Sequence, residues 1–449
     1  MGIDVVDYLL LPLYLFIIRY FIIRIKRKHY ADDPAMGKYL VTGCWAKIVG
    51  SISFALMMQY YYKEGDSFMY YTGGLDFKKA LLSDFPHHLN FLFMPAEDFG
   101  RYYEENFDNF HNYGYIASSQ NLLAAKFVSL FSVITFNKYI LVSLCFGLFS
   151  FSGMWQCFKL FYSYFPSLKK WLSIPFLFTP SLLFWGGGIL KDPLCIGFLG
   201  WLIVSAHLFF IKKQFNIKLL LIILFSFYCL SILKSYVAFA FLPFFILWIF
   251  LDFVKSIANP IVRKSIIPLL IAVSVPFLYF KYNLISDYVG ATALETFSDF
   301  LKETKYLYEI TTGDEGAFIN MTDIEPSIPG FLKQLPISIA TTLFRPFLWE
   351  SKKIITLFSA LESAIFLLFT LYVLAKTRVY RFFTIVFKYN ILIFCFFFSI
   401  FFAGAVGLTC FNFGSLVRYK IPCLPFYIAS LIIILHLNNT RNKALLKQG

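Results

Sequence analysis

One segment indicates the kind of fold most directly: PFLFTPSLLFWGGGILKDP, residues 175–193. Its apolar part is long enough to cross most of a bilayer, which takes about 20 residues of helix, and three glycines, Lys191 and Asp192 follow it. Glycine in a membrane helix allows close helix packing or a bend of the backbone. Two opposite charges beside such a run are costly unless they are hydrated, paired or functional. Lys191 and Asp192 are therefore either an ion pair at a helix end or part of a site.

The composition of the whole chain indicates a membrane protein. Of its 449 residues, 59% are hydrophobic, 58 are Phe and 15% are charged, and the mean hydropathy is +0.68. Lipid can solvate this much apolar surface, whereas a soluble fold cannot bury it. The net charge of +14 comes from basic residues in short loops, as in cytoplasmic loops of membrane proteins, so we expect no nucleic-acid partner. The eight cysteines are single and indicate neither a disulfide framework nor a zinc site.

Apolar segments of bilayer-crossing length predict an all-α polytopic membrane protein with about eleven transmembrane helices. The predicted spans lie near residues 4–24, 40–60, 138–160, 171–189, 194–211, 217–234, 236–253, 265–282, 353–375, 383–403 and 419–437. Segments 119–135 and 335–349 are predicted to be helices on the outer membrane surface, the first because of its helical apolar spacing and the second because it is short and contains two prolines. No linker interrupts the chain, which predicts one transmembrane domain over residues 1–449.

Charged residues predict the orientation in a cytoplasmic (inner) membrane. A basic cluster at residues 24–28 follows the first span, which places the N-terminus outside and identifies this span as uncleaved. Alternation then puts the C-terminus in the cytoplasm and two long polar loops, about 61–137 and 283–352, outside. Segments 61–120 and 283–334 of these loops hold eighteen of the 26 carboxylates. The chemistry is therefore expected on the outer face.

The first candidate site is YYYKEGDSFMYY, residues 60–71, directly after the second predicted span. Glu64 and Asp66 lie where a helix is expected to meet water, among tyrosines such as Tyr70 that can anchor at the interface or stack on a sugar. A carboxylate there can act as a general base or bind a divalent metal such as Mg²⁺ or Mn²⁺. The alternative is an ordinary aromatic belt with hydrated acids.

Three further candidates carry cations on the same predicted face. Lys191 is suited to hold a phosphate as a point charge, with Asp192 orienting it or acting as a second carboxylate. In TLFRPFLWES, residues 342–351, Arg345 and Glu350 flank aromatic residues, which suits a lipid phosphate or pyrophosphate. At the predicted mouth of the last span lie Arg418, Tyr419 and Lys420. For Arg345, Arg418 and Lys420 the structural alternative is a side chain that snorkels from a helix.

The common location of these cations favours an anionic lipid substrate. The bias of basic residues toward the cytoplasm leaves few expected outside, yet Lys191, Arg345, Arg418 and Lys420 all fall there at span ends. Cations opposite a carboxylate suit sugar transfer from a polyprenyl phosphate: the cations stabilise the charge that grows on the leaving phosphate, and the carboxylate accepts the proton of the acceptor.

The order of these features resembles the integral-membrane glycosyltransferases of the GT-C class, which use lipid-phosphate sugars. GDSFMYY, residues 65–71, resembles their acidic motif with Asp66 in the acid position, and segment 119–135 resembles a surface helix of their first external loop. LVRYKIPCLPF, residues 416–426, resembles the Arg-Tyr-x-x-Pro pattern near their C-terminal end. The resemblance implies a polyprenyl-phosphate-linked sugar as donor, a glycan or lipid as acceptor, and contact with membrane lipids. Asp192 or Glu350 would have to supply a second acidic motif.

Two other classes remain open from the sequence. A Wzy-type polysaccharide polymerase or O-antigen ligase-like enzyme would use Arg345 and Arg418 for its chemistry, with Asp66 incidental. A transporter or flippase of lipid-linked sugars is the third class, although transporters usually place charges near the middle of the membrane and often contain inverted repeats. Here the charges cluster at span ends and no repeat is visible.

Overall fold

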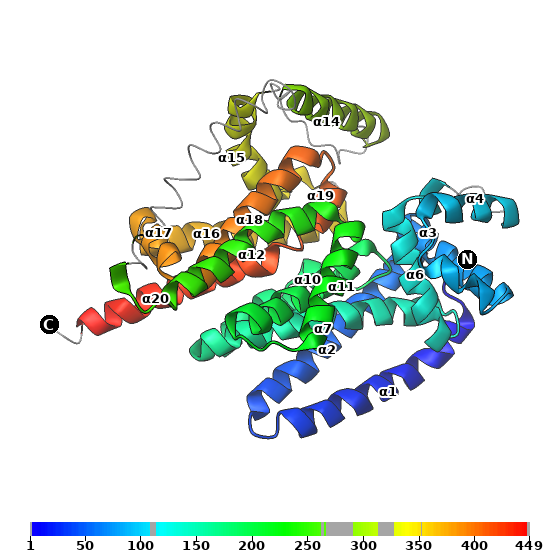
Figure 1. Cartoon of the computed structure of the whole chain (residues 1–449), viewed down its shortest axis with the longest axis horizontal. Helices are drawn as coiled ribbons and strands as arrows, with labels where there is room; N and C mark the ends of the chain where they lie inside the picture. The colour runs from blue at the N-terminus through cyan, green and yellow to red at the C-terminus, as the bar shows by residue number, and fades with distance from the viewer. Residues whose placement is uncertain are drawn as a thin grey trace. The chain divides into compact units, whose positions relative to one another are not determined.

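The structure is a computed structural model that describes residues 2–107, 114–261, 265, 291–312, 327–351 and 353–446. These residues form helices joined by short connections (Figure 1), which confirms the all-α prediction. Among them, seven helices are long and apolar enough to cross a membrane, or up to eight if one bent pair is a single span. The chain is thus a multi-pass membrane protein by length and composition, while the count of about eleven spans and the membrane orientation stay predictions.

Backbone contacts divide the chain into two compact units, Met1–Phe239 and Ala240–Gly449. We call them the N-terminal and the C-terminal unit and describe each by itself. The prediction of one domain over residues 1–449 stays a prediction.

Long apolar helices make up most of the N-terminal unit. They are α1 (Val5–His29), α2 (Pro34–Met57), α7 (Tyr139–Tyr164), α10 (Lys191–Ala206) and α11 (Ile217–Leu233). Local sequence signals fix where the first two begin: Asp4 and Asp7 form a capping box for α1, and Asp33 accepts a hydrogen bond from the Met36 amide in front of Pro34.

Polar contacts tie the helix ends together at the two ends of this bundle. At the end where α1 begins, Lys138 pairs with Asp4 at 2.6 Å, and the hydroxyls of Tyr8 and Tyr60 are 2.6 Å apart. At the opposite end, Trp155 donates to the Tyr30 hydroxyl at 3.0 Å. The first and third predicted spans therefore start at the same end, and the second runs back between them.

The predicted span 171–189 is wrong as a single helix. The structure breaks it into α8 (Lys169–Ser173), a π-helical turn (Ile174–Phe178), α9 (Pro180–Phe184) and a bend through three glycines. Pro175 and Pro180 have no amide hydrogen to donate, so a regular helix cannot continue through them. The segment still runs the length of the bundle, because Lys169 binds Asp33 at one end and Lys191 binds Asn121 at the other.

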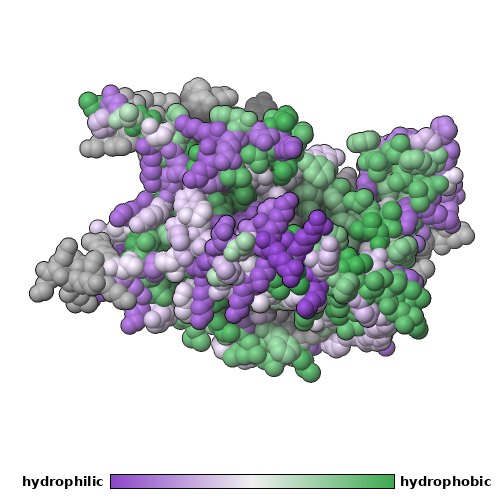
Figure 2. All heavy atoms as spheres, turned by 90° about the horizontal axis from the view of Figure 1, so that it is seen from below, coloured by the Kyte–Doolittle hydropathy of each residue, from purple (hydrophilic) through white to green (hydrophobic). Residues whose placement is uncertain are grey.

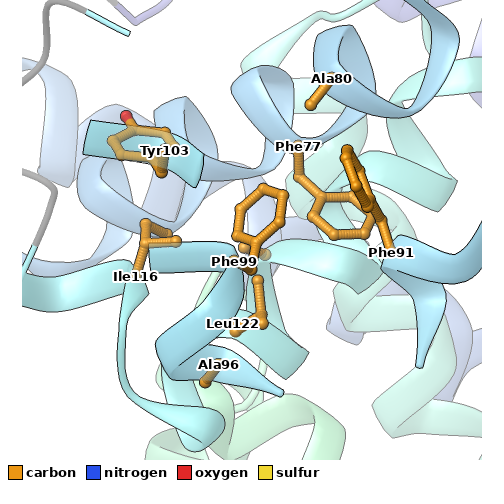
Figure 3. Packing of buried hydrophobic residues seen from close by; sticks show 9 residues of the cluster. Phe77, Ala80, Phe91, Ala96, Phe99, Tyr103, Ile116 and Leu122 are labelled. Carbon is orange, nitrogen blue, oxygen red and sulfur yellow. The ribbon is translucent and has the colours of Figure 1, made fainter. Parts of the chain in front are cut away.

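Residues predicted as the first external loop form a small helical layer with its own core. Its elements are α3 (Asp66–Ser83), a 3₁₀ helix (His87–Leu92), α4 (Ala96–Asn106) and α6 (Ser119–Ile134). Figure 3 shows this core, in which Phe77, Phe91 and Phe99 pack together. α6 lies where a helix was predicted over 119–135. The ring centres of Phe127 in α6 and Phe198 in α10 are 5.6 Å apart. The membrane-surface position of α6 stays a prediction.

The C-terminal unit contains the remaining helices. They are α14 (Ala291–Thr312), α15 (Ile328–Phe344), α16 (Ile354–Thr377), α17 (Val379–Lys388), α18 (Asn390–Thr409), α19 (Phe413–Tyr419) and α20 (Leu424–Leu446), while α12 (Ser235–Lys255) runs across the boundary of the two units.

Three sequence expectations differ in detail in this unit. The predicted span 383–403 begins instead at Asn390, because the extended backbone of Tyr389 separates it from α17. Residues 335–344 of the predicted segment 335–349 are the C-terminal part of a longer helix, which begins at Ile328 and ends at Phe344. The predicted last span is part of the pair α19 and α20, which bends by 62°. The predicted span 265–282 lies, except for residue 265, outside the described residues.

Candidate functional site

Asp66 is the first residue of α3, and residues 63–65 separate it from the π-helical turn (Met58–Tyr62) that extends α2. Gly65 before it has φ +119°, a conformation that side chains disfavour and glycine allows. The turn leaves the Asp66 carboxylate half-buried, where it accepts a hydrogen bond from the Tyr115 hydroxyl at 2.8 Å. The acid of the GDSFMYY motif is therefore held in a defined position rather than free in a loop.

Lys191 joins the same cluster through two side-chain amides of α6. Its ammonium group donates to Gln120 Oε1 and to Asn121 Oδ1, each at 3.1 Å. Tyr70 donates to the same Asn121 oxygen at 3.1 Å, and the Asn121 amide donates to the carbonyl of Tyr115 at 2.9 Å. We call Asp66, Tyr70, Tyr115, Gln120, Asn121 and Lys191 the Asp66–Lys191 cluster. It brings together three of the residues predicted from sequence, Asp66, Tyr70 and Lys191.

Asp192 pairs with a residue that the sequence analysis did not single out. Its carboxylate is 2.5 Å from the ammonium of Lys234, which follows α11, and the two residues are 1% and 5% exposed. The predicted alternative of an ion pair between Lys191 and Asp192 is therefore replaced by the pair Asp192–Lys234. Lys191 remains close enough to Asp66, Asp192 and Lys234 for their charges to interact.

The three glycines before Lys191 serve close packing against α2. A Cβ atom on Gly188 would lie 1.9 Å from the ring of Phe54, and one on Gly187 would lie 2.9 Å from Ser51 Oγ. Of the two uses predicted for these glycines, close helix packing and a bend of the backbone, the structure contains both. This packing fixes the start of α10, and with it the position of Lys191 and Asp192.

In the C-terminal unit, Arg345 and Glu350 form a partly buried pair. The Arg345 guanidinium donates from Nε to both Glu350 oxygens at 3.0 and 3.1 Å and from a second nitrogen to Oε1. It also lies 5.1 Å from the ring centre of Phe413. A guanidinium held by a carboxylate and an aromatic ring has a fixed orientation, but its charge is already balanced.

Lys420 is fully buried in the same unit. It follows α19 and donates to the Arg345 carbonyl at 3.2 Å and to Ser363 Oγ at 2.8 Å. Arg418 and Tyr419 form the last turn of α19. The ammonium of Lys420 thus links α15, α16 and the break between α19 and α20, and its role in substrate binding stays a prediction.

The predicted residues therefore fall into two groups in separate units. Asp66, Tyr70, Lys191 and Asp192 lie in the N-terminal unit, and Arg345, Glu350, Arg418, Tyr419 and Lys420 lie in the C-terminal unit. Glu64 is exposed and outside the Asp66–Lys191 cluster. Convergence of cations from both units on one substrate stays a prediction. Within the described residues no group of three or more His, Cys, Asp or Glu side chains could hold a metal, and a role for Mg²⁺ or Mn²⁺ stays a prediction.

Sequence reasoning missed Tyr115, Asn121 and Lys234. Asn121 lies near the start of segment 119–135, whose apolar spacing predicted a helix but no polar contact. Lys234 had a usable signal, since it is a lone cation between two apolar runs and such residues need a partner. Tyr115 carried no signal, because its contact with Asp66 joins residues 49 positions apart in the chain.

No protein family model, no curated protein and no solved structure matches this chain.

Proposed function

We propose that the protein is a membrane glycosyltransferase that moves a sugar from a polyprenyl-(pyro)phosphate donor to a glycan or lipid acceptor on the outer face of the cytoplasmic membrane. The observation that supports the proposal is the Asp66–Lys191 cluster. Hydrogen bonds through two tyrosines and an asparagine connect a half-buried carboxylate with an ammonium group. The cluster lies at the ends of two apolar helices, α2 and α10. A lipid phosphate and an aqueous acceptor meet at such a boundary.

In the proposed reaction, the acceptor hydroxyl oxygen attacks the anomeric carbon of the sugar. The bond from that carbon to the phosphate oxygen breaks, and polyprenyl phosphate or pyrophosphate leaves with the electron pair. Lys191 stabilises the negative charge on the leaving group, and Asp66 takes the proton of the acceptor hydroxyl. Tyr115 orients the Asp66 carboxylate, while Gln120 and Asn121 orient the Lys191 ammonium.

The test is sugar transfer by the purified protein in nanodiscs supplied with polyprenyl-phosphate-linked hexoses, measured as release of polyprenyl phosphate. We expect Asp66→Asn and Lys191→Ala each to lower the rate by about 10²-fold or more, as for loss of a general base or a charge-stabilising group. Asp98→Asn and Lys218→Ala are matched controls, since both residues are exposed and lie outside the cluster. These controls should keep the parent rate.

Other outcomes point to the other classes. Loss of activity in Arg345→Ala, with Asp66→Asn active, would support a polymerase or ligase-like enzyme instead. Movement of the lipid-linked sugar across vesicles without any new glycosidic bond would support a transporter, and the transferase proposal would then be abandoned.

A further inference from the structure

The second half of α1 carries a surface cavity of about 600 Å³. Aromatic and basic side chains of this one helix line it, principally Phe16, Arg19, Tyr20, Arg24, Arg27 and Lys28. No carboxylate lines the cavity, so its charge is strongly positive.

The four cations of this cavity are exposed and unneutralised. Within the described part of the chain, no ion pair or side-chain hydrogen bond joins Arg19, Arg24, Arg27 or Lys28 to another residue. Two lysines at other helix ends of this unit do have such partners, since Lys138 binds Asp4 and Lys169 binds Asp33. The protein itself thus leaves this cluster without a counter-charge.

Arg19 has a greater need for a bound anion than Arg27 and Lys28 have, because of its position in α1. Cations in the last turn of a helix are stabilised by the helix dipole, which accounts for Arg27 and Lys28. Arg19 is ten residues before the end of α1, about 15 Å along the helix axis, and lies within an apolar candidate span. A charge there is costly unless it reaches polar groups at the membrane boundary.

The side of α1 around the cavity faces outward from the protein. Only 11% of the apolar window of α1 is buried, and Leu13 and Phe21 are 53% and 52% exposed. Figure 2 shows the face on which α1 lies in Figure 1, where hydrophobic and hydrophilic surface lie side by side. In a membrane, the molecules next to such a surface are lipids.

We propose that this cavity binds the phosphate headgroup of an anionic phospholipid of the bilayer. The arginines would hold phosphate oxygens through their planar, multiple N–H donors, and Arg19 would reach the headgroup by extending along the helix. Phe16 and Tyr20 would contact the glycerol and upper acyl region, where aromatic rings are favoured. Basic pockets at the ends of membrane helices bind anionic headgroups in this manner.

This site is separate from the proposed transfer site. The cavity lies on the half of α1 that leads to Tyr30, whose hydroxyl contacts Trp155 at one end of the bundle. The Asp66–Lys191 cluster lies at the opposite end, where α2 leads into α3. Loss of one site should therefore leave the other intact.

The experiment titrates phosphatidylglycerol into the full-length protein in neutral detergent and counts bound lipids by native mass spectrometry. The variant Arg19→Gln/Arg24→Gln removes two cations from the cavity, and Lys213→Gln/Lys218→Gln removes two exposed cations elsewhere. Each basic residue near anionic lipid contributes about fivefold in affinity, so we expect roughly 25-fold weaker binding of one lipid in the first variant. The control variant should bind as the parent does.

Two further arms separate the sources of the phosphate. Phosphatidylcholine should not compete, because it carries no net charge, and inorganic phosphate should displace the lipid only weakly, because it lacks the acyl chains that contact Phe16 and Tyr20. Displacement by inorganic phosphate at equal concentration would overturn the lipid assignment.

A charge-conserving variant tests whether weaker lipid binding comes from the lost arginine contacts rather than from a change in folding. Arg19→Lys/Arg24→Lys keeps both charges but loses the multiple donors, so its affinity should fall between those of the parent and the glutamine variant. Circular dichroism and size exclusion should show the same fold in all variants. Equal lipid binding by the parent and a folded glutamine variant would mean that the cluster is only a hydrated basic surface, and the proposal would be rejected.

Discussion

A buried ion pair, Asp192 and Lys234, lies beside Lys191 of the proposed site. Both side chains are nearly inaccessible and their charged atoms are 2.5 Å apart. Removal of one partner from a buried pair leaves an uncompensated charge, which costs about 3–5 kcal/mol, whereas replacement of both by apolar groups is often close to neutral. The pair therefore fixes the start of α10 relative to the end of α11.

We predict that Lys234→Met lowers the thermal unfolding midpoint in detergent strongly, and that Asp192→Leu/Lys234→Met recovers most of the loss. The measurement is a double-mutant cycle that includes Asp192→Leu alone. If the double variant is as unstable as the sum of the two single variants, the two residues are not coupled in the folded protein.

The pair of Asp33 and Lys169, at the opposite end of the same unit, should make stability depend on pH. Lys169 donates to both Asp33 oxygens at 2.8 and 2.9 Å, and this contact lowers the pKa of Asp33 below its ordinary value of 3.8. Because the pKa is lower in the folded chain than in the unfolded chain, the contribution is fully present above about pH 4. It is lost as the pH falls through the lowered pKa.

We predict that Asp33→Asn is less stable than the parent at pH 7 by less than about 1 kcal/mol, since the pair is partly exposed. The difference should shrink below pH 3.8. Asparagine can still accept the hydrogen bond of the Met36 amide that caps α2, so the variant keeps the cap and removes the charge together with the second acceptor oxygen, which Tyr162 and Lys169 contact. Unfolding midpoints measured between pH 3 and pH 7 check this, and a constant difference over that range would contradict it.

At the scale of elements, glycines set the contact between α7 and α10. A Cβ on Gly200 of α10 would lie 2.4 Å from the backbone of Gly153 of α7, and one on Gly153 would lie 2.4 Å from the Gly197 carbonyl. Small residues that let two backbones approach are the usual interface of membrane helices. The atoms that such a Cβ would meet belong to the backbone, which cannot move away by a change of rotamer as a side chain can.

Gly200→Ala should therefore force α7 and α10 apart and destabilise the protein by about 1–3 kcal/mol, the usual cost of overpacking. Gly114→Ala is the matched control, since a Cβ at Gly114 meets nothing within 4 Å. Unfolding midpoints in detergent give the comparison. Equal midpoints for the two variants would show that the helices can separate at little cost.

The broken segment between Lys169 and Lys191 shows which features of a helix the apolar pattern predicts and which it does not. A long apolar run with bilayer length correctly predicts a segment that runs from one end of the bundle to the other. It does not predict a continuous helix, because prolines and glycines break the backbone pattern even where the side chains are apolar. Likewise, Tyr389 separates α17 from α18 inside one apolar run.

At the scale of the whole molecule, the predicted orientation can be tested by labelling. Glu97 of α4 and Lys213 after α10 are both exposed and belong to regions predicted outside and inside, respectively. In intact cells a membrane-impermeant thiol reagent should label Glu97→Cys, and it should label Lys213→Cys only after permeabilisation.

The parent protein is the control for this experiment, because its eight cysteines are free and all but Cys145 are buried. Labelling of both positions from one side would contradict the alternation of spans. Labelling of Lys213→Cys alone in intact cells would invert the predicted orientation.

Sequence alone is sufficient to infer an all-α membrane protein and to locate several of its long helices, such as α1, α7 and α16. Transfer of apolar side chains from water to lipid depends on local composition, and helix caps such as Asp4 and Asp33 depend on a few neighbouring residues, so both can be read along the chain. The motif GDSFMYY also directed attention to Asp66 and Tyr70.

The partners of the charged groups, in contrast, follow from the tertiary structure. Asp192 binds Lys234 from another helix, Lys191 binds Asn121 from a third, and Lys420 is enclosed by Arg345 and Ser363. The cost of burying a charge requires that each find a partner, but it does not say which one. That choice depends on which helix ends packing brings together, through contacts between residues far apart in the chain.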